Sequence, residues 1–180
     1  MRAWRGLPLL VGLVLSSCTG TWESGAMGWG APQATLSPAQ QIEALRSELI
    51  PAQDSLTGYG PTFSRAGYEQ ILEWNGAMAA EMRWADAYEA LDIRLPCCDA
   101  VHPNRDETRN CGCGHHAALY GVSKSLLHRG FSVAETQTAV DRWKAFFFPK
   151  ERLLAELRQR TLTDPGYEQA LNDLEQQGAC

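Results

Sequence analysis

Residues 114–129 read G-H-H-A-A-L-Y-G-V-S-K-S-L-L-H-R, with apolar side chains recurring at the spacing of an α-helix. Gly130 follows the last apolar position and predicts a helix end at which the glycine adopts a left-handed conformation. Residues 132–135, S-V-A-E, form a capping box, which predicts that another helix starts at once. This pair of adjacent helices indicates the fold class.

Helix signals also precede this pair. Ser37-Pro38-Ala39-Gln40 combines an N-cap, a proline in the first turn and a capping glutamine, and Pro51 ends the helix. Ser64 can cap a second helix, in which Asn75-Gly76 is a breaker or a kink. A further helical stretch is expected from Met78 to Leu91.

Two more helices are expected near the C-terminus, over residues 150–160 and from Asp164-Pro165 onward. No segment shows the sustained period-two alternation of a half-buried strand. We therefore expect an all-α fold: a single irregular bundle of about five to seven helices, with a Cys/His loop between two of them.

The stretch from Pro96 to His116 holds most of the metal-binding chemistry. It contains the candidate ligands Cys97, Cys98, Cys111, Cys113, His115 and His116. Two ligand clusters joined by a loop are typical of zinc-type sites, although C-C and C-G-C are tighter than the usual spacing. Thiolate and imidazole suit zinc or copper, whereas few carboxylates among the candidates disfavour calcium or magnesium.

Helix geometry distinguishes the two adjacent histidines. If the helix begins near Gly114, His115 shares a stripe with Leu119, Val122 and Leu126, so we expect His115 to be the inward-facing histidine. The positive end of the helix dipole also favours thiolates at nearby cysteines.

Two other interpretations of the cysteines stay open. The chain could be a thiol–disulfide redox protein that uses Cys111 and Cys113, or a helical interaction module stapled by disulfides. The sequence has no C-x-x-C pair, nucleophile elbow, phosphate loop or His-Glu helix motif, so an enzyme is not favoured. Cys180 leaves an odd number of thiols if Cys18 is modified.

The N-terminal residues predict export. Residues 1–17 run from a short basic segment through an apolar core to L-S-S, just before Cys18. The apolar core is shorter than the about 20 residues of a membrane-spanning helix. The L-S-S-C pattern resembles a bacterial lipobox, which implies cleavage before Cys18 and lipidation of its thiol; an ordinary secretory signal is the alternative.

These features predict three segments: a signal peptide over 1–17, a lipidated cysteine with a flexible tether over 18–36, and a helical metal-binding domain over 37–180. The lipid would hold the chain to a membrane of the cell envelope, facing the extracytoplasmic side. Cleavage would remove Arg2 and Arg5 but no acidic residue, so the net charge of −5 would become −7. Such a balance disfavours a nucleic-acid partner.

The motifs P-C-C at 96–98 and C-G-C-G-H-H at 111–116 resemble bacterial lipoproteins that carry a P-C-Y-C-G-C-G motif. In that family a lipobox and a tether precede a small Cys-rich domain, for which metal binding is the usual inference. The resemblance implies Cys111 and Cys113 as site residues, together with Cys97 or Cys98. This chain departs from the family pattern through the insertion at 99–110 and the lack of a cysteine in the following helix.

Overall fold

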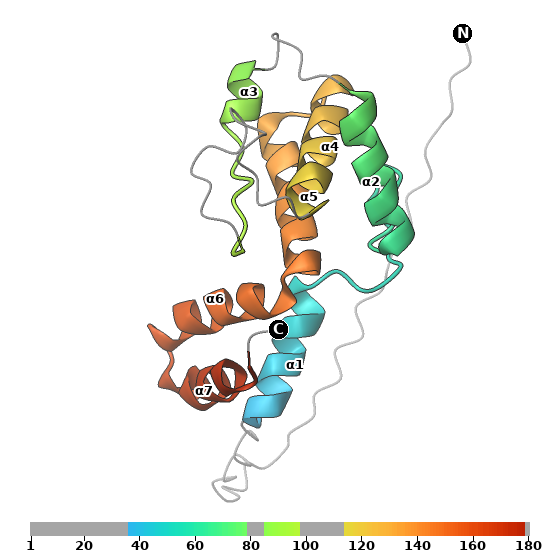
Figure 1. Cartoon of the computed structure of the whole chain (residues 1–180). Helices are drawn as coiled ribbons and strands as arrows, with labels where there is room; N and C mark the ends of the chain where they lie inside the picture. The colour runs from blue at the N-terminus through green and yellow to red at the C-terminus, as the bar shows by residue number, and fades with distance from the viewer. Residues whose placement is uncertain (1–35, 79–84, 98–113, 179–180) are drawn as a thin grey trace, which may run out of the picture. The chain divides into compact units, whose positions relative to one another are not determined.

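The computed structural model describes residues 36–78, 85–97 and 114–178, and within these ranges the fold is all-α (Figure 1). The helices are α1 (Pro38–Leu49), α2 (Arg65–Ala77), α3 (Ala85–Glu89), α4 (Gly114–His128), α5 (Val133–Phe147), α6 (Pro149–Thr161), the 3₁₀ turn η3 (Pro165–Tyr167) and α7 (Glu168–Gln176). The described ranges contain no β-strand, and Leu56 and Thr62 form an isolated antiparallel bridge. The expected fold class is confirmed.

Capping residues set the helix starts as the sequence predicts. Ser37 and Ser132 each form a complete capping box, and the Ser64 side chain accepts a hydrogen bond from the Gly67 amide. After α4, Gly130 adopts a φ of 85°, and the Phe131 amide bonds back to the Leu126 carbonyl at 3.0 Å. These contacts satisfy backbone groups that a helix end would otherwise leave without partners.

Two local expectations differ from the structure, and a third is only partly described. Asn75-Gly76 does not break α2, which continues to Ala77. Glycine costs about 1 kcal/mol in a helix, and one glycine in the last turn does not outweigh the packing of the rest. Residues 164–165 start the short turn η3 before α7 begins. The helical stretch expected from Met78 to Leu91 is described only in part, as α3, because residues 79–84 lie outside the described ranges.

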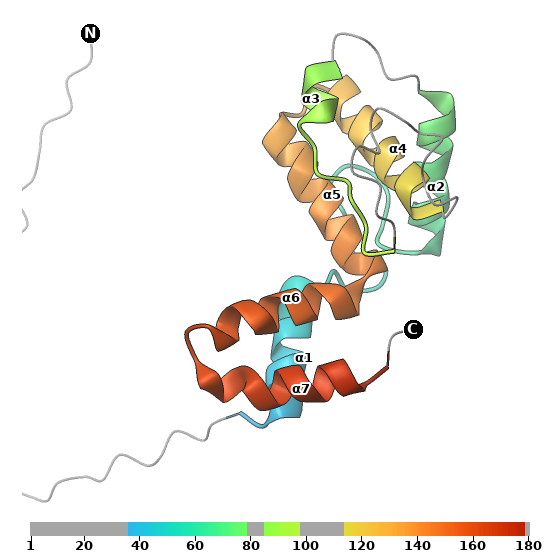
Figure 2. The same cartoon turned by 60° about the vertical axis from the view of Figure 1, so that its left-hand side comes forward.

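The larger hydrophobic core surrounds α4, which lies between α2 and α5 (Figures 1 and 2). Every residue from Ala118 to Leu127 is buried. A Cβ atom at Gly121 would collide with the Ile71 carbonyl oxygen of α2, so glycine allows the two helix backbones to approach closely. Trp143 of α5 is fully buried and packs against Phe63, with ring centroids 4.8 Å apart.

A smaller core joins α1, α6 and α7, and its buried residues are Ile42, Leu45, Leu153, Leu157, Ala170 and Leu174. Arg160 links this group at its edge, because its guanidinium bonds to Glu48 of α1, Glu156 of α6 and the Tyr167 hydroxyl. Only Phe148 separates α5 from α6. The larger core and the smaller core are therefore connected directly through α5 and α6.

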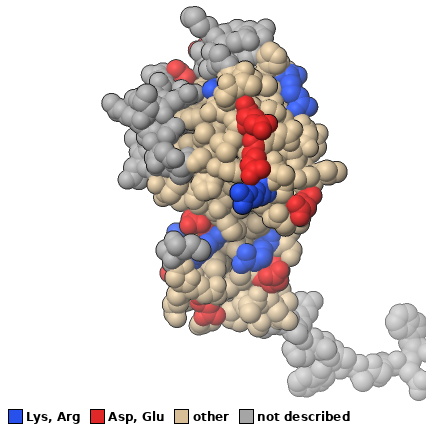
Figure 3. Space-filling view, turned by 45° about the vertical axis from the view of Figure 1, so that its right-hand side comes forward, with Lys and Arg blue, Asp and Glu red and all other residues tan. Residues whose placement is uncertain are grey.

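The described surface carries charges of both signs. On the face seen in Figure 3, lysine and arginine side chains form small groups among acidic and uncharged residues. None of the helices in the described ranges has both the length and the hydropathy needed to cross a membrane.

Candidate metal centre

The described residues include three of the six candidate ligands. Cys97 is exposed at the end of the segment that follows α3, and His115 and His116 lie in the first turn of α4. Cys98, Cys111 and Cys113, and the predicted lipidation site Cys18, lie outside the described residues. The structure therefore describes only the candidate ligands at the two ends of the cysteine-bearing stretch.

His116 lies in the core, with 0% of its surface exposed. Its ring stacks on Tyr120 at a centroid separation of 6.2 Å and hydrogen-bonds to the backbone of Ile93. Burial lowers the pKa of His116, the bond to Ile93 opposes this shift, and the charge of nearby His115 adds to it. The ring is thus held in the neutral form that a metal ligand requires.

His115 occupies a different environment, at the edge of the same core. Its ring lies 4.7 Å from Phe147, 5.2 Å from Phe148 and 6.0 Å from Tyr68, measured between centroids. Partial burial against these rings lowers the pKa of His115 as well. The first turn of α4 therefore presents two imidazoles to different neighbours, and burial favours the neutral form of each.

The expectation that His115 is the inward-facing histidine is wrong, because His116 is the fully buried one. The stripe predicted for His115 is buried at Leu119, Val122 and Leu126, but α4 is surrounded at mid-helix, so the neighbouring stripe is buried too. At the first turn, Ile93 reaches the side of His116. A periodicity argument cannot find this contact, because Ile93 lies outside any helix.

The segment that leads to Cys97 is fixed to α5 and α4. Gln137 exchanges two hydrogen bonds with the backbone of Asp92, and Lys144 donates to the Asp92 carbonyl at 3.1 Å. Ile93 and Leu95 are buried, whereas Pro96 and Cys97 are exposed. These contacts hold the chain close to the start of α4 just before the first cysteine pair.

The start of α4 is equally constrained. A Cβ atom at Gly114 would collide with the Tyr68 hydroxyl of α2, so a larger residue there would require the Tyr68 ring to shift. The sequence signals the importance of this glycine only through its place next to the histidines. Tyr68 thus lies beside the start of α4 and also contacts the His115 ring.

The described residues do not by themselves form a metal site, since they contain no group of three or more His, Cys, Asp or Glu side chains arranged for one ion. The donor chemistry of Cys97, His115 and His116 nevertheless fits a soft or borderline ion, because thiolate and neutral imidazole are the ligands such ions prefer.

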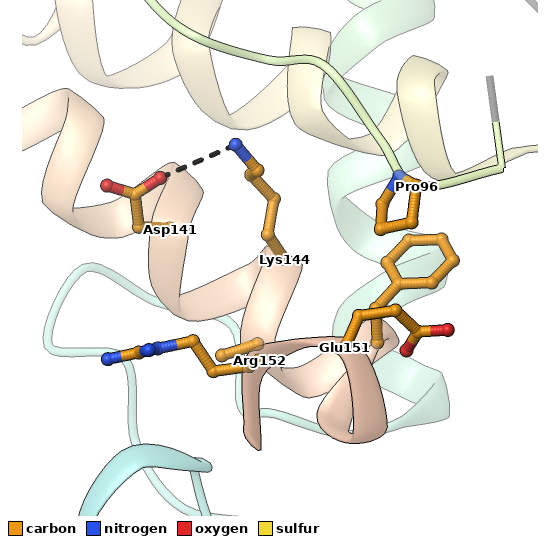
Figure 4. A pocket seen from close by; sticks show the side chains of 7 residues that line it. Pro96, Asp141, Lys144, Glu151 and Arg152 are labelled. Atoms are coloured by element: carbon orange, nitrogen blue, oxygen red, sulfur yellow. Dashed lines mark ion pairs between the residues drawn. The ribbon is translucent and has the colours of Figure 1, made fainter. Parts of the chain in front are cut away.

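A cavity of about 410 Å³ lies beside this region, between α5 and α6 (Figure 4). Pro96, the residue before Cys97, and Phe148 form part of its wall. The Phe148 ring also contacts the His115 ring. Lys144 points across it and pairs with Asp141 at 3.7 Å. No sequence pattern predicts this cavity, because it depends on the angle between two helices.

Comparison with known proteins does not assign the chain: no protein-family model, curated protein or solved structure matches it.

Proposed function

We propose that this chain is a lipid-anchored protein on the extracytoplasmic side of the cell envelope, and that its helical domain binds a transition metal. Zinc or copper is the proposed ion, for structural stabilisation or for metal handling. The proposed ligands are drawn from Cys97, Cys98, Cys111, Cys113, His115 and His116, and the proposed lipidation site is Cys18.

The contact between His116 and Ile93 carries the proposal. The chain enters the cysteine-bearing stretch four residues after Ile93 and leaves it just before α4. The buried His116 ring contacts Ile93, so the two ends of the cysteine-bearing stretch lie close together. Ligand side chains near each end can therefore start close to one another. Two ligand clusters that start close together can reach one ion at a small cost in chain entropy.

The lowered pKa values of His115 and His116 support the same reading, because a protonated imidazole cannot bind a metal. The two rings face different neighbours, so we expect a single ion to use one of them. When bound, the metal would cross-link the two flanks and act as a Lewis acid. The protein would contribute thiolate and neutral imidazole donors and an apolar surround.

The test uses the mature lipoprotein, purified in detergent under reducing conditions. Metal content is measured by mass spectrometry, and thiols are counted before and after chelation. We expect about one ion per chain, protection of thiols by the metal, and loss of both in Cys113→Ser. Cys180→Ser is the matched control and should keep the ion.

A second pair of variants identifies the histidine ligand. His115→Asn and His116→Asn are compared with His128→Asn, which changes an exposed histidine at the other end of α4. Far-ultraviolet circular dichroism checks that each variant remains helical. Metal-free protein whose cysteines instead cycle between thiol and disulfide would overturn the proposal in favour of a redox protein. Protein with stable disulfides and no metal would favour a stapled interaction module.

A further inference from the structure

A second cavity, of about 210 Å³, lies away from the cysteine-bearing region, where the 57–59 turn meets α4 and α5. Apolar groups from Leu126, Phe131 and Ala139 line part of it. Its polar wall consists of Thr57, Tyr59, Glu135, Thr138 and Arg142. The cavity therefore combines an apolar surface with a small set of polar groups, as ligand sites do.

Arg142 is the side chain of this wall whose N–H groups have no hydrogen-bond partner among the described residues. Its guanidinium lies 4.8 Å from the centre of the Phe63 ring, which holds it in place by a cation–π contact. Among the described residues, Arg142 makes no hydrogen bond and no ion pair with a carboxylate. Arg142 is exposed, so its five N–H donors face solvent and are available to a ligand, and the Phe63 ring restricts where the guanidinium lies.

A second guanidinium reinforces the positive charge. Arg129 donates to the Tyr59 carbonyl at 2.7 Å and lies 5.5 Å from the centre of the Phe131 ring. Both contacted residues line the cavity. The protein is acidic as a whole, with a net charge of −5, so two arginines beside one cavity, one after α4 and one in α5, are a local departure from its charge balance.

The base of the cavity is rigid. The buried Trp143 indole donates to the Tyr59 hydroxyl at 2.9 Å, and the Tyr59 amide donates to Thr57 Oγ1 at 3.3 Å. Thr57 in turn donates to the Pro61 carbonyl at 2.7 Å. Such a preformed wall reduces the entropy that a ligand must lose with its site on binding.

We propose that this cavity binds a small monocarboxylate with a compact apolar body, whose carboxylate pairs with Arg142 and whose body rests on Phe131 and the edge of Ala139. Planar guanidinium and carboxylate groups match each other through two parallel hydrogen bonds. The volume limits the ligand to roughly ten non-hydrogen atoms, below the size of ordinary drug-like ligands.

Glu135 argues for a singly charged ligand. Its carboxylate is engaged at the helix cap, where it accepts from the Ser132 amide at 2.8 Å and from the Ser132 hydroxyl at 2.6 Å. It still contributes negative charge to the wall, and only one arginine lines the cavity itself. A dianion such as phosphate would meet more repulsion and would not use the apolar surface.

The experiment measures binding of 3-methylbutanoate and benzoate to the mature, full chain by ligand-observed NMR and calorimetry. The uncharged amides of both acids, and inorganic phosphate, are run in parallel. A ligand of this size is expected to bind with a Kd of about 0.1–1 mM. Arg142→Gln should weaken binding at least about tenfold, because it removes a charge-assisted hydrogen-bonded pair.

Two further variants make the result specific. Arg65→Gln makes the same charge change at an exposed side chain of α2 and should leave binding unchanged. Thr138→Leu narrows the cavity without altering charge and should also weaken binding. The proposal is overturned if no carboxylate binds, if the amides or phosphate bind as tightly as the acids, or if Arg142→Gln matches the unsubstituted protein.

Discussion

The two hydrophobic cores of this protein are built differently. The α1–α6–α7 core buries only aliphatic side chains, and no polar side chain of these three helices is buried in the described structure. The α2–α4–α5 core is rich in aromatic rings and also buries the polar residues His116, Ser123, Lys124, Ser125 and Thr136.

The two cores therefore differ in whether they bury polar groups. Burying a polar group costs free energy unless hydrogen bonds compensate for it, so an aliphatic core is the simpler way to stabilise a fold. In the larger core Ser123 and Lys124 are compensated by hydrogen bonds to the Leu119 carbonyl and to Asn75, whereas His116 Nε2 has no hydrogen-bond partner among the described residues. For His116, the proposed explanation is that burial keeps a potential metal ligand neutral and holds the two flanks of the cysteine-bearing stretch together.

The largest expected effect lies in the aliphatic core. Leu157→Ala should lower the free energy of unfolding by about 2–5 kcal/mol, because it leaves a cavity among packed leucines. Leu162→Ala is the control, since Leu162 is 76% exposed and should change stability by less than about 0.5 kcal/mol. Urea denaturation followed by circular dichroism measures both. Equal effects for the two variants would show that the aliphatic core does not stabilise the fold as described.

A smaller effect is expected where two helix backbones meet in the larger core. Gly121→Ala should destabilise by about 1–3 kcal/mol, because the new methyl group meets the backbone of Ile71. Gly76→Ala, in α2, has open space around the added methyl group and should stabilise by about 0.5–1 kcal/mol. Thermal unfolding of both variants distinguishes packing from helix propensity. If both were stabilising, the close approach of α2 and α4 would be contradicted.

The smallest effect concerns acid pH. Hydrogen bonds from Arg94 are the main cause that lowers the pKa of Asp92 to about 2, with Lys144 adding to the shift. The Asp92 carboxylate therefore stabilises the fold above about pH 4, and this contribution is lost as the pH falls toward 2.

Asp92→Asn tests this contribution. The side chain is 46% exposed, so solvent limits the effect to less than about 1 kcal/mol near pH 7. The difference in unfolding free energy between the variant and the unsubstituted protein should shrink as the pH is lowered. A difference that grows with acid would show that the sign is wrong.

Local signals in the sequence predicted much of this fold. Ser37, Ser64, Ser132 and Gly130 define helix ends through contacts within a few residues, so the sequence alone contains them. The all-α class follows from the same patterns. The boundaries of the leader, tether and domain stay predictions.

The candidate site was less accessible to sequence reasoning. Helical periodicity located the pair His115–His116 but chose the wrong ring as the buried one, because the choice depends on Ile93 and on aromatic residues of α2 and α5. Arg142 gave no signal either, since its role depends on Phe63 and on a cavity formed by distant segments. Contacts between remote segments leave no pattern in any one of them.

Phe148 is a one-residue connection between α5 and α6. It is at once the last cap of α5 and the first cap of α6, so its two backbone torsions set the angle between those helices. A change of about 10° there would carry the far end of the 13-residue α6 through roughly 3 Å. The ring of the same residue rests 5.2 Å from that of His115. One residue therefore links the angle between α5 and α6 to the surroundings of His115.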